Sequence, residues 1–203
     1  MGKLIIGADE VGLGALAGPV VTAAVILPAG IKFQGLRDSK KMTPTDRAWM
    51  DSRIREEALG WVIAGSNSEL IDQHGIDKCR WVCMGACVAF CLERFPTAMV
   101  VVDGNRKIPG IPWNMQTAII KADDKVLEVS AASVIAKVYR DRLMVRLWEE
   151  LPYYDWKKNA GYGTRDHLAA LRKYGVSVYH RKSYGPVTKQ LAKEEKHAES
   201  NSH

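Results

Sequence analysis

The sequence predicts a mixed α/β fold in which a five-stranded sheet is flanked by helices and followed by a helical C-terminal region. Short runs rich in Ile and Val, such as KLIIGADE and TAMVVVDG, are typical of buried strands. Longer apolar segments, at 76–95 and 129–151, have the length of helices. No stretch approaches the ~20 apolar residues of a membrane-spanning helix.

The first half of the chain begins with a predicted hairpin. Residues 3–10 and 18–27 read as strands, and the short gap that holds Gly12-Leu13-Gly14 indicates an antiparallel connection. Thr43-Pro44 predicts a helix start, since proline is favoured at the first helical position, and this helix should reach about Ala58. Residues 61–66 then predict a third strand.

The second half predicts two more strands among helices. A helix over 76–95 leads into a strand at 98–103, a fifth strand follows at 117–122, and a helix covers 129–151. A shorter helix over 166–174 has Thr164 as a candidate cap and Gly175 as a stop. We expect one domain over 1–188 and a flexible or loosely helical polar tail over 189–203.

Composition narrows the class of protein. The chain has 203 residues, of which 47% are hydrophobic and 26% charged, as in an ordinary globular protein. It shows no apolar signal core, so we expect a cytosolic (cytoplasmic) protein. The net charge of +6 and the pI of about 9.1 fit an anionic partner without proving one.

The four cysteines recur at intervals of four, at 79, 83, 87 and 91. On a helix that rises about 1.5 Å per residue, the first and last lie about 18 Å apart and cannot share one metal ion. Pairs four apart could bind a soft metal, but no accompanying histidine spacing supports this. We therefore interpret the cysteines as a buried structural stripe.

Carboxylates follow three of the predicted strands. Asp9 and Glu10 end the first, Asp103 ends the fourth, and Asp123 and Asp124 follow the fifth. Adjacent strands lie about 4.8 Å apart, so acids at their ends bring like charges together. Divalent cations bound to a phosphodiester substrate would relieve that repulsion.

Several motifs together resemble the ribonuclease HII family over nearly the whole chain. GADEVGLGALAGPVVTAAVIL resembles its DEAGRG…GPVVAAAV opening, and DSKKMTPTDR resembles its DSKKLT segment. VVDGN resembles its VDG strand end, and KADDKVLEVSAASVIAKVYRDRLM its KGD…SAASIxAKVxRDxxM block. GYGTRDH and HRKSYGPV resemble its GYGT and HRxSF-P motifs. The order of six motifs makes the resemblance specific.

The resemblance implies a ribonuclease H-like fold and a metal-dependent endonuclease. Such an enzyme hydrolyses the RNA strand of RNA–DNA hybrids. It also incises duplex DNA on the 5′ side of an embedded ribonucleotide, leaving 3′-hydroxyl and 5′-phosphate ends. Its role would be removal of misincorporated ribonucleotides and RNA primers. Carried over residue by residue, the catalytic and metal-binding carboxylates would be Asp9, Glu10, Asp103 and Asp123. They would hold two Mg²⁺ or Mn²⁺ ions, for which carboxylate oxygens are suitable ligands.

Asp9 and Glu10 present a geometric difficulty. Successive side chains of a regular strand point to opposite faces, so both acids converge only if the strand ends early. We expect the turn that begins near Gly12 to break the strand and let Glu10 face the metals. Asp124 is interpreted as surface charge or a helix cap.

The glycine turn departs from the family pattern, because Leu13 stands where ribonuclease HII has an arginine. The resemblance implies that the backbone amides of this turn meet the 2′-hydroxyl of the ribonucleotide, which Gly12 and Gly14 still allow. A charged phosphate contact is lost, however. The alternative is a ribonuclease HIII-like enzyme, with an uncharged residue here and weak activity at single ribonucleotides. The intact tyrosine motif and the lack of an extra N-terminal domain in this sequence oppose that alternative.

Other substrate contacts are predicted from the same resemblance and from charge. Tyr162 would stack on the sugar that follows the ribonucleotide, where a 2′-hydroxyl distinguishes RNA from DNA. Phosphate contacts would be sequence-independent and salt-sensitive. The candidate basic and polar residues, any of which could instead be solvated charge, are Lys40, Lys41, Lys137, Arg140, Arg181 and Ser183. Lys137 and Arg140 could instead pair with acids.

Three other classes of protein fit less well. A binding module without catalysis would not need all four acids, and a glycosidase would need only two. A serine hydrolase built on Ser183 and His180 lacks a nucleophile-elbow motif. The expected partners are RNA–DNA hybrids and DNA duplexes that contain ribonucleotides. We expect a monomer, and no paired-aromatic motif in the tail supports a sliding-clamp partner.

Overall fold

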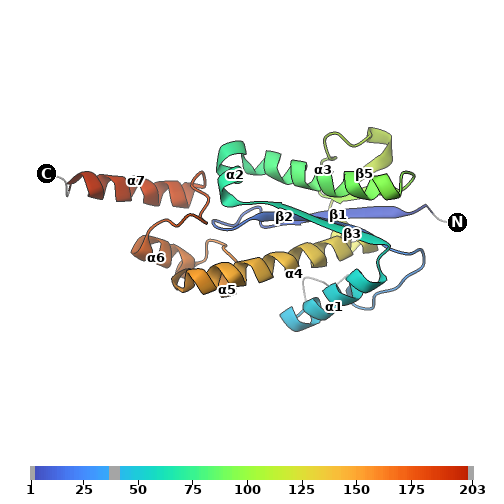
Figure 1. Cartoon of the computed structure of the whole chain (residues 1–203), viewed down its shortest axis with the longest axis horizontal. Coiled ribbons are helices and arrows are strands. Elements are labelled where there is room, and N and C mark those ends of the chain that lie inside the picture. The colour runs from blue at the N-terminus through green and yellow to red at the C-terminus, as the bar shows by residue number, and fades with distance from the viewer. Residues whose placement is uncertain (1–2, 37–41, 201–203) are drawn as a thin grey trace. The chain divides into compact units, whose positions relative to one another are not determined.

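The computed structural model describes residues 3–36 and 42–200, with side chains up to residue 197 (Figure 1). The strands are β1 (Ile5–Val11), β2 (Val20–Ile26), β3 (Gly60–Ser66), β4 (Met99–Asp103) and β5 (Gln116–Ile119). The helices are α1 (Pro44–Glu57), α2 (Ser68–His74), α3 (Ile76–Arg94), α4 (Leu127–Glu150), α5 (Trp156–Asn159), α6 (Arg165–Tyr174) and α7 (Gly185–Ser200). Short 3-10 helices lie at Trp113–Met115, Ala122–Asp124 and Pro152–Tyr154.

The chain folds into two compact units. The first comprises Met1–Val11, Val21–Gly65 and Arg80–Tyr139, and the second comprises Gly12–Val20, Ser66–Cys79 and Arg140–His203. Each unit is assembled from several separate segments of the sequence. That one domain spans 1–188 remains a prediction, although α7 continues as a helix beyond residue 188.

The first unit is built on the predicted five-stranded mixed sheet, whose strand order is β3-β2-β1-β4-β5. β1 and β2 form the predicted antiparallel hairpin, with Gly7 opposite Val25. β1 pairs with β4 in parallel, and β4 pairs with β5 in parallel. The carboxyl ends of β1, β4 and β5 therefore lie at one edge of the sheet.

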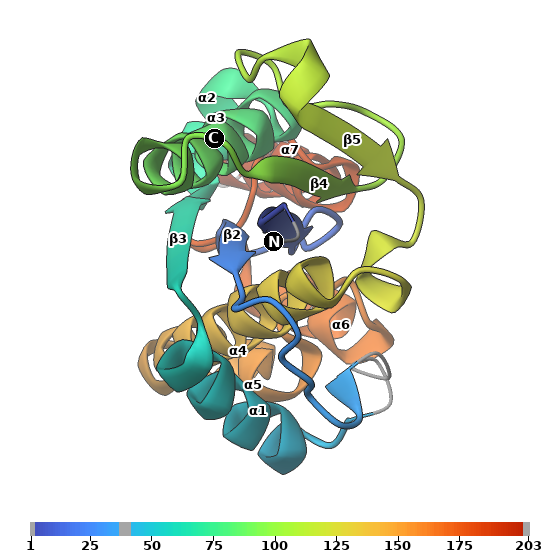
Figure 2. The same ribbon diagram turned by 90° about the vertical axis from the view of Figure 1, so that its right-hand side faces the viewer.

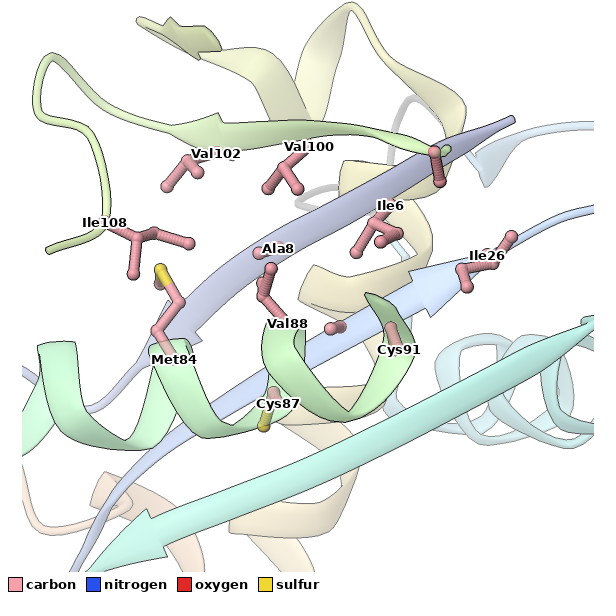
Figure 3. Close-up of a cluster of buried hydrophobic side chains, with 12 residues drawn as sticks. Ile6, Ala8, Ile26, Met84, Cys87, Val88, Cys91, Val100, Val102 and Ile108 are labelled. Atoms are coloured by element: carbon pink, nitrogen blue, oxygen red, sulfur yellow. The ribbon is translucent and has the colours of Figure 1, made fainter. Parts of the chain in front are cut away.

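Helices cover both faces of this sheet, and Figure 2 shows α3 and α4 on opposite sides of it. On the α3 face, strand side chains and helix side chains form one buried cluster, drawn in Figure 3. Each buried Ile or Val contributes roughly 1.5–3 kcal/mol. The cluster includes Ile6, Ala8, Ile26, Met84, Cys87, Val88, Cys91, Val100, Val102 and Ile108.

The opposite face packs against the start of α4. Ile5 of β1, Val101 of β4 and Val129 of α4 share a second cluster. Gly7 allows the close approach, because a Cβ there would lie 2.1 Å from the backbone carbon of Glu128. The sheet is thus covered on both faces along β1 and β4.

The second unit is helical and carries its own apolar clusters. One cluster gathers around Trp156 and Tyr154, and another around Leu16, Leu171 and Val187. Its helices include α6, which begins at the predicted cap Thr164 and ends at Gly175.

Most predicted elements are confirmed to within two residues at each end. β5 is an exception, since it ends at Ile119 rather than at 122. Lys121 has a left-handed backbone (φ 56°), which turns the chain out of the strand and into the 3-10 helix Ala122–Asp124. The short helix α2 was not predicted.

The cysteine stripe is confirmed as structural. All four cysteines are buried and none of the four forms a disulfide, and burial raises the pKa of the Cys87 thiol to about 11. Among the described residues, no helix combines the length and the apolar character needed to cross a bilayer.

Candidate active site

Asp9 and Asp103 occupy matching places on neighbouring strands. Ala8 of β1 pairs with Val102 of β4, so the next residue on each parallel strand is one of these two acids. Asp9 is only 6% exposed. Burial raises the pKa of the Asp9 carboxyl well above its usual range, and the charges of Glu10 and Asp103 raise it further.

Two hydrogen bonds oppose that shift in the pKa of Asp9. The Ser133 hydroxyl of α4 and the backbone N–H of Glu10 both donate to the carboxylate, the latter over 2.8 Å. Burial and like charge outweigh them, so the carboxylate of Asp9 is an unfavourable buried anion until a cation or a proton compensates it.

Asp103 connects the end of β4 to the segment that carries Asp123. One carboxylate oxygen of Asp103 accepts a hydrogen bond from the backbone N–H of Ala122 over 2.7 Å. Asp123, the next residue, is 4% exposed. The left-handed turn at Lys121 and this hydrogen bond together fix the 3-10 helix that holds Asp123, while Asp124 is exposed as expected.

Glu10 does not follow the expected path. β1 continues through Glu10 to Val11, with Glu10 opposite Thr22 on β2, so the turn does not break the strand before this acid. Glu10 therefore lies on the α3 face of the sheet, where its carboxylate is 3.2 Å from a guanidinium nitrogen of Arg80. The expectation that Glu10 and Asp9 converge is wrong in this conformation, because strand pairing keeps the regular alternation.

Consistent with this divergence, no three His, Cys, Asp or Glu side chains among the described residues converge closely enough to hold a metal ion. Asp9 and Asp103 nevertheless repel each other, and both carry the hard oxygen atoms that Mg²⁺ and Mn²⁺ prefer. In donor type and charge the site fits a divalent cation.

The glycine turn belongs to the second unit. Its backbone closes with a hydrogen bond from Ala15 N–H to the Gly12 carbonyl, over 3.4 Å. Gly12 has φ 93°, a conformation that favours glycine, and a Cβ there would lie 2.3 Å from Nε of Arg140. Gly14 is exposed, with open space where a Cβ would stand.

Leu13 is anchored at both its side chain and its carbonyl. The side chain packs against a cluster of Val20, Ile71 and Cys79, to which Tyr184 also contributes. The carbonyl accepts two hydrogen bonds, one from the Tyr184 hydroxyl over 2.6 Å and one from Nη1 of Arg181 over 2.9 Å. An apolar environment at this position suits leucine and disfavours a charged side chain.

Tyr162 is half-buried on a loop that a histidine pair supports. The guanidinium carbon of Arg140 lies 5.6 Å from the centre of the Tyr162 ring. The Tyr162 carbonyl accepts from Nδ1 of His167 over 2.9 Å. His167 Nε2 is also 3.1 Å from Nε2 of His180.

The histidine pair has one consistent proton assignment. With Nδ1 of His167 donating to a carbonyl, its Nε2 must accept from Trp156 Nε1 and from His180 Nε2. Nδ1 of His180 then accepts from the backbone N–H of Ser177. Both rings are neutral, and burial lowers the pKa of each, that of His180 to about 3.

Arg140 and Arg181 correct the prediction of phosphate contacts. Both side chains are completely buried. Arg140 donates to the carbonyls of Pro19, Ala160 and Ala17 over 2.8, 2.9 and 3.2 Å. Burial lowers its pKa to about 10, which leaves it charged at neutral pH.

Arg181 is used in the same way, since its Nε donates to the Gly18 carbonyl over 3.0 Å and its Nη1 to the Leu13 carbonyl and the Tyr184 hydroxyl. A guanidinium that is buried and bonded to backbone carbonyls does not contact a phosphate. These two arginines build the turn rather than touch the substrate.

The remaining predicted contacts fall into three groups. Ser183 is exposed and donates to a carboxylate oxygen of Asp72 over 2.6 Å. Lys137 is half-buried on α4, one turn after Ser133 and therefore on the same face of the helix. Lys40 and Lys41 lie outside the described residues.

Sequence reasoning missed Ser133, Arg80 and the histidine pair. Ser133 could have been found, because Ser133 and Lys137 are four residues apart within the SAASVIAK segment and share a helix face. Arg80 could not, since it is 70 residues from Glu10 and no local pattern joins them.

The model of the family described as "Ribonuclease HII" matches residues 6–187. Ribonuclease HII of Ehrlichia ruminantium (strain Welgevonden) is 43% identical over 188 residues, which cover 92% of this chain and 87% of that protein. The ribonuclease HII in a complex with PCNA from Archaeoglobus fulgidus has a TM-score of 0.71 at 25% identity, covering 87% of this chain and 91% of that one.

A Bst-RNase HIII crystallised in complex with Mn²⁺ shares the fold, with a TM-score of 0.78 at 17% identity, covering 96% of this chain and 71% of that one. The carboxylates at the ends of β1 and β4, the matched family model and the relatives agree on one assignment. This chain belongs to the ribonuclease HII family and is an endoribonuclease of the ribonuclease H type.

Proposed function

We propose that the chain hydrolyses the RNA strand of RNA–DNA hybrids and incises duplex DNA on the 5′ side of embedded ribonucleotides. The products would carry 3′-hydroxyl and 5′-phosphate ends. The single observation that carries this proposal is the placement of Asp9 and Asp103 side by side on parallel strands. Paired carboxylates of this kind are what a metal-dependent phosphodiester hydrolase requires.

In this proposal Asp9, Glu10, Asp103 and Asp123 hold two Mg²⁺ or Mn²⁺ ions. When bound, such ions activate the attacking water and stabilise the leaving oxygen. The Mn²⁺ complex of Bst-RNase HIII supports a divalent cation for the shared fold.

The chain's own residues prepare the carboxylates. Ser133 and the Glu10 N–H orient the carboxylate of Asp9, and Ala122 N–H orients that of Asp103. The raised pKa of Asp9 means that a proton and a cation compete for this carboxylate. Glu10 would exchange the guanidinium of Arg80 for a new cation.

The second unit would recognise the ribonucleotide. The turn Gly12-Leu13-Gly14 would present backbone N–H groups to the 2′-hydroxyl, and Tyr162 would stack on the next sugar. The exposed Gly14 supports this role, because nothing fills the space beside it. Lys40, Lys41, Lys137 and Ser183 remain proposed contacts with the phosphate backbone.

The second candidate is a ribonuclease HIII-like specificity, with efficient hybrid cleavage and weak activity at single ribonucleotides. Leu13 favours it, since its side chain packs in an apolar cluster and supplies no charge to a phosphate. The loss of a charge-assisted hydrogen bond corresponds to about 1.5–3 kcal/mol.

The deciding experiment compares two substrates in Mg²⁺ and in Mn²⁺, with the product ends mapped. One is a DNA duplex with a single embedded ribonucleotide, and the other is a continuous RNA–DNA hybrid. Cleavage of both, with the cut on the 5′ side of the lone ribonucleotide, supports the first proposal. Cleavage of the hybrid alone supports the HIII-like alternative, and activity that survives a chelator contradicts both.

Partners other than nucleic acid need a separate test. We propose a monomer, to be checked by light scattering. The relative from Archaeoglobus fulgidus is described in a complex with PCNA, so a sliding clamp is the first protein partner to test, although no paired-aromatic motif in the tail supports it.

A further inference from the structure

The carbonyl of Leu13 is the most strongly held acceptor in the glycine turn. It accepts from the Tyr184 hydroxyl over 2.6 Å and from Arg181 Nη1 over 2.9 Å. The two donors are themselves joined, since Arg181 Nη1 also lies 3.0 Å from the Tyr184 oxygen. Three polar atoms from two distant segments therefore converge on one side of the turn.

Fixing this carbonyl also fixes the next amide. The peptide between Leu13 and Gly14 is planar and trans, so its C=O and N–H point in opposite directions. With the oxygen held towards Tyr184 and Arg181, the N–H of Gly14 points away from them. No backbone carbonyl among the described residues accepts from this N–H, and the space beside Gly14 is open.

The segment that carries the two donors is itself anchored to the residues after the turn. The N–H of Arg181 donates to the Leu16 carbonyl over 2.8 Å, and the N–H of Gly18 donates to the Tyr179 carbonyl over 2.9 Å. The Tyr184 ring packs in the same apolar cluster as the Leu13 side chain. The hydroxyl of Tyr184 is therefore held at the turn by packing as well as by hydrogen bonds.

We propose that Tyr184 and Arg181 are positioning residues that aim the Gly14 N–H at the 2′-oxygen of the substrate ribonucleotide. This inference rests on the proposed function and extends it by naming what orients the recognising amide. A rigid donor recognises a 2′-hydroxyl better than a mobile one, because no ordering entropy is lost on binding.

Tyr184→Phe is the sharpest variant, since it removes one hydroxyl and keeps the ring that packs against Leu13. The HRxSF-P motif has phenylalanine at this position, so the variant should fold. Tyr154→Phe is the matched control, because it removes a tyrosine hydroxyl that donates to the Gly175 carbonyl over 2.8 Å elsewhere in the same unit.

The measurement is the affinity of full-length protein, made inactive by Asp103→Asn, for two duplexes. One contains a single ribonucleotide and the other is all DNA. The Kd for the all-DNA duplex divided by the Kd for the ribonucleotide duplex reports recognition of the 2′-hydroxyl. We expect Tyr184→Phe to lower this ratio about threefold to tenfold, the scale of one neutral hydrogen bond. Tyr154→Phe should leave the ratio unchanged.

The outcomes separate the inference from the function on which it rests. If the parent protein discriminates and Tyr184→Phe keeps the full ratio, the inference is overturned and the proposed function stands. An equal loss of affinity for both duplexes indicates a structural role only, which also overturns it. A parent protein that does not distinguish the duplexes contradicts incision at single ribonucleotides and the inference together.

Discussion

The carboxylate edge of the first unit and the glycine turn of the second unit treat charge in opposite ways. At the edge, Asp9 is buried beside other acids, and its raised pKa shows that its two hydrogen bonds do not offset burial and like charge. At the turn, Arg140 and Arg181 are buried deeper still, yet backbone carbonyls accept hydrogen bonds from both guanidinium groups. Charge left unbalanced is available to a substrate or cofactor, whereas balanced charge builds structure.

The largest expected effect comes from the unbalanced charge. Asp103→Asn should reduce turnover by about 10³-fold or more, the scale seen when one member of a catalytic set is removed. Binding of the hybrid should be nearly unchanged, because the amide oxygen of asparagine can still accept from Ala122 N–H. Single-turnover cleavage and a binding titration measure the two effects.

The matched control for Asp103→Asn is Asp124→Asn, at an exposed acid of the 3-10 helix next to Asp123. We expect this control to keep its activity. Turnover retained by the Asp103 variant would refute its assignment as a metal ligand.

The balanced charge should affect stability instead. Arg140→Met removes the donor of one buried and two partly buried carbonyls, at roughly 1–3 kcal/mol each, so we expect the free energy of unfolding to fall by about 3–5 kcal/mol. Denaturant titration measures this. Arg146→Ala, at an exposed arginine of the same helix, should change it by less than about 0.5 kcal/mol.

The salt dependence of nucleic-acid affinity tests directly whether Arg140 contacts a phosphate. A phosphate contact at Arg140 would contribute about 0.9 to the slope of log affinity against log salt. We expect Arg140→Met to leave the slope unchanged, since the side chain is buried. If Arg140→Met stays stable and the slope becomes smaller, Arg140 contacts a phosphate after all.

The contrast between the two regions also explains what the sequence could predict. Strands rich in Ile and Val, the caps Thr43 and Thr164, and Asp103 at the end of its strand are local patterns, and the structure has them as expected. The left-handed turn at Lys121, which shortened the fifth strand, has no comparable signature, because lysine rarely adopts positive φ.

The roles of the buried arginines were not predictable from local patterns. Arg140 bonds to a carbonyl 121 residues away, and Arg181 to one 168 residues away. In sequence a buried arginine and a phosphate-binding arginine look the same. The prediction for Glu10 was wrong for a related reason, since the direction of its side chain depends on strand pairing with β2 and on the contact with Arg80.

The next largest effect is the change in the free energy of unfolding with pH that the neutral, buried histidines cause. His180 has a pKa of about 3 in the folded chain and about 6.5 when unfolded, so the unfolded state binds more protons in between. Stability is full above about pH 6.5 and falls as the pH decreases towards 3. Between pH 6.5 and 5 the loss from this group is about 2 kcal/mol.

Comparison with His180→Gln isolates this contribution from that of other groups. The variant cannot titrate here, so its stability should decline about 2 kcal/mol less between pH 6.5 and 5, although it is less stable at pH 7. Urea titrations at the two pH values measure the free energy of unfolding of each protein. If it falls by the same amount in both proteins between pH 6.5 and 5, the pair is not neutral in the folded state.

A smaller effect is expected from restoring charge at the turn. Leu13→Arg should raise cleavage at a single ribonucleotide, relative to the hybrid, by about tenfold if the new guanidinium reaches a phosphate. Leu13→Ala is the control, since it removes the same apolar packing without adding charge, and it should give no gain. If Leu13→Arg cuts the single ribonucleotide no better than the natural protein, junction preference does not depend on this residue.

The smallest expected effect concerns Glu10, whose carboxylate has a cationic partner in the structure. Arg80 lies 3.2 Å from Glu10, and both side chains are largely buried. Arg80→Gln removes a cation that competes with a metal ion for Glu10, so half-maximal activity should need about threefold to fivefold less Mn²⁺, the scale of an ion pair worth up to ~1 kcal/mol. A metal titration of cleavage measures this. If the variant needs more Mn²⁺ than the natural protein, Arg80 orients Glu10 for metal binding instead of competing with the metal. The ion pair would then have a structural role, like the hydrogen-bonded arginines of the second unit.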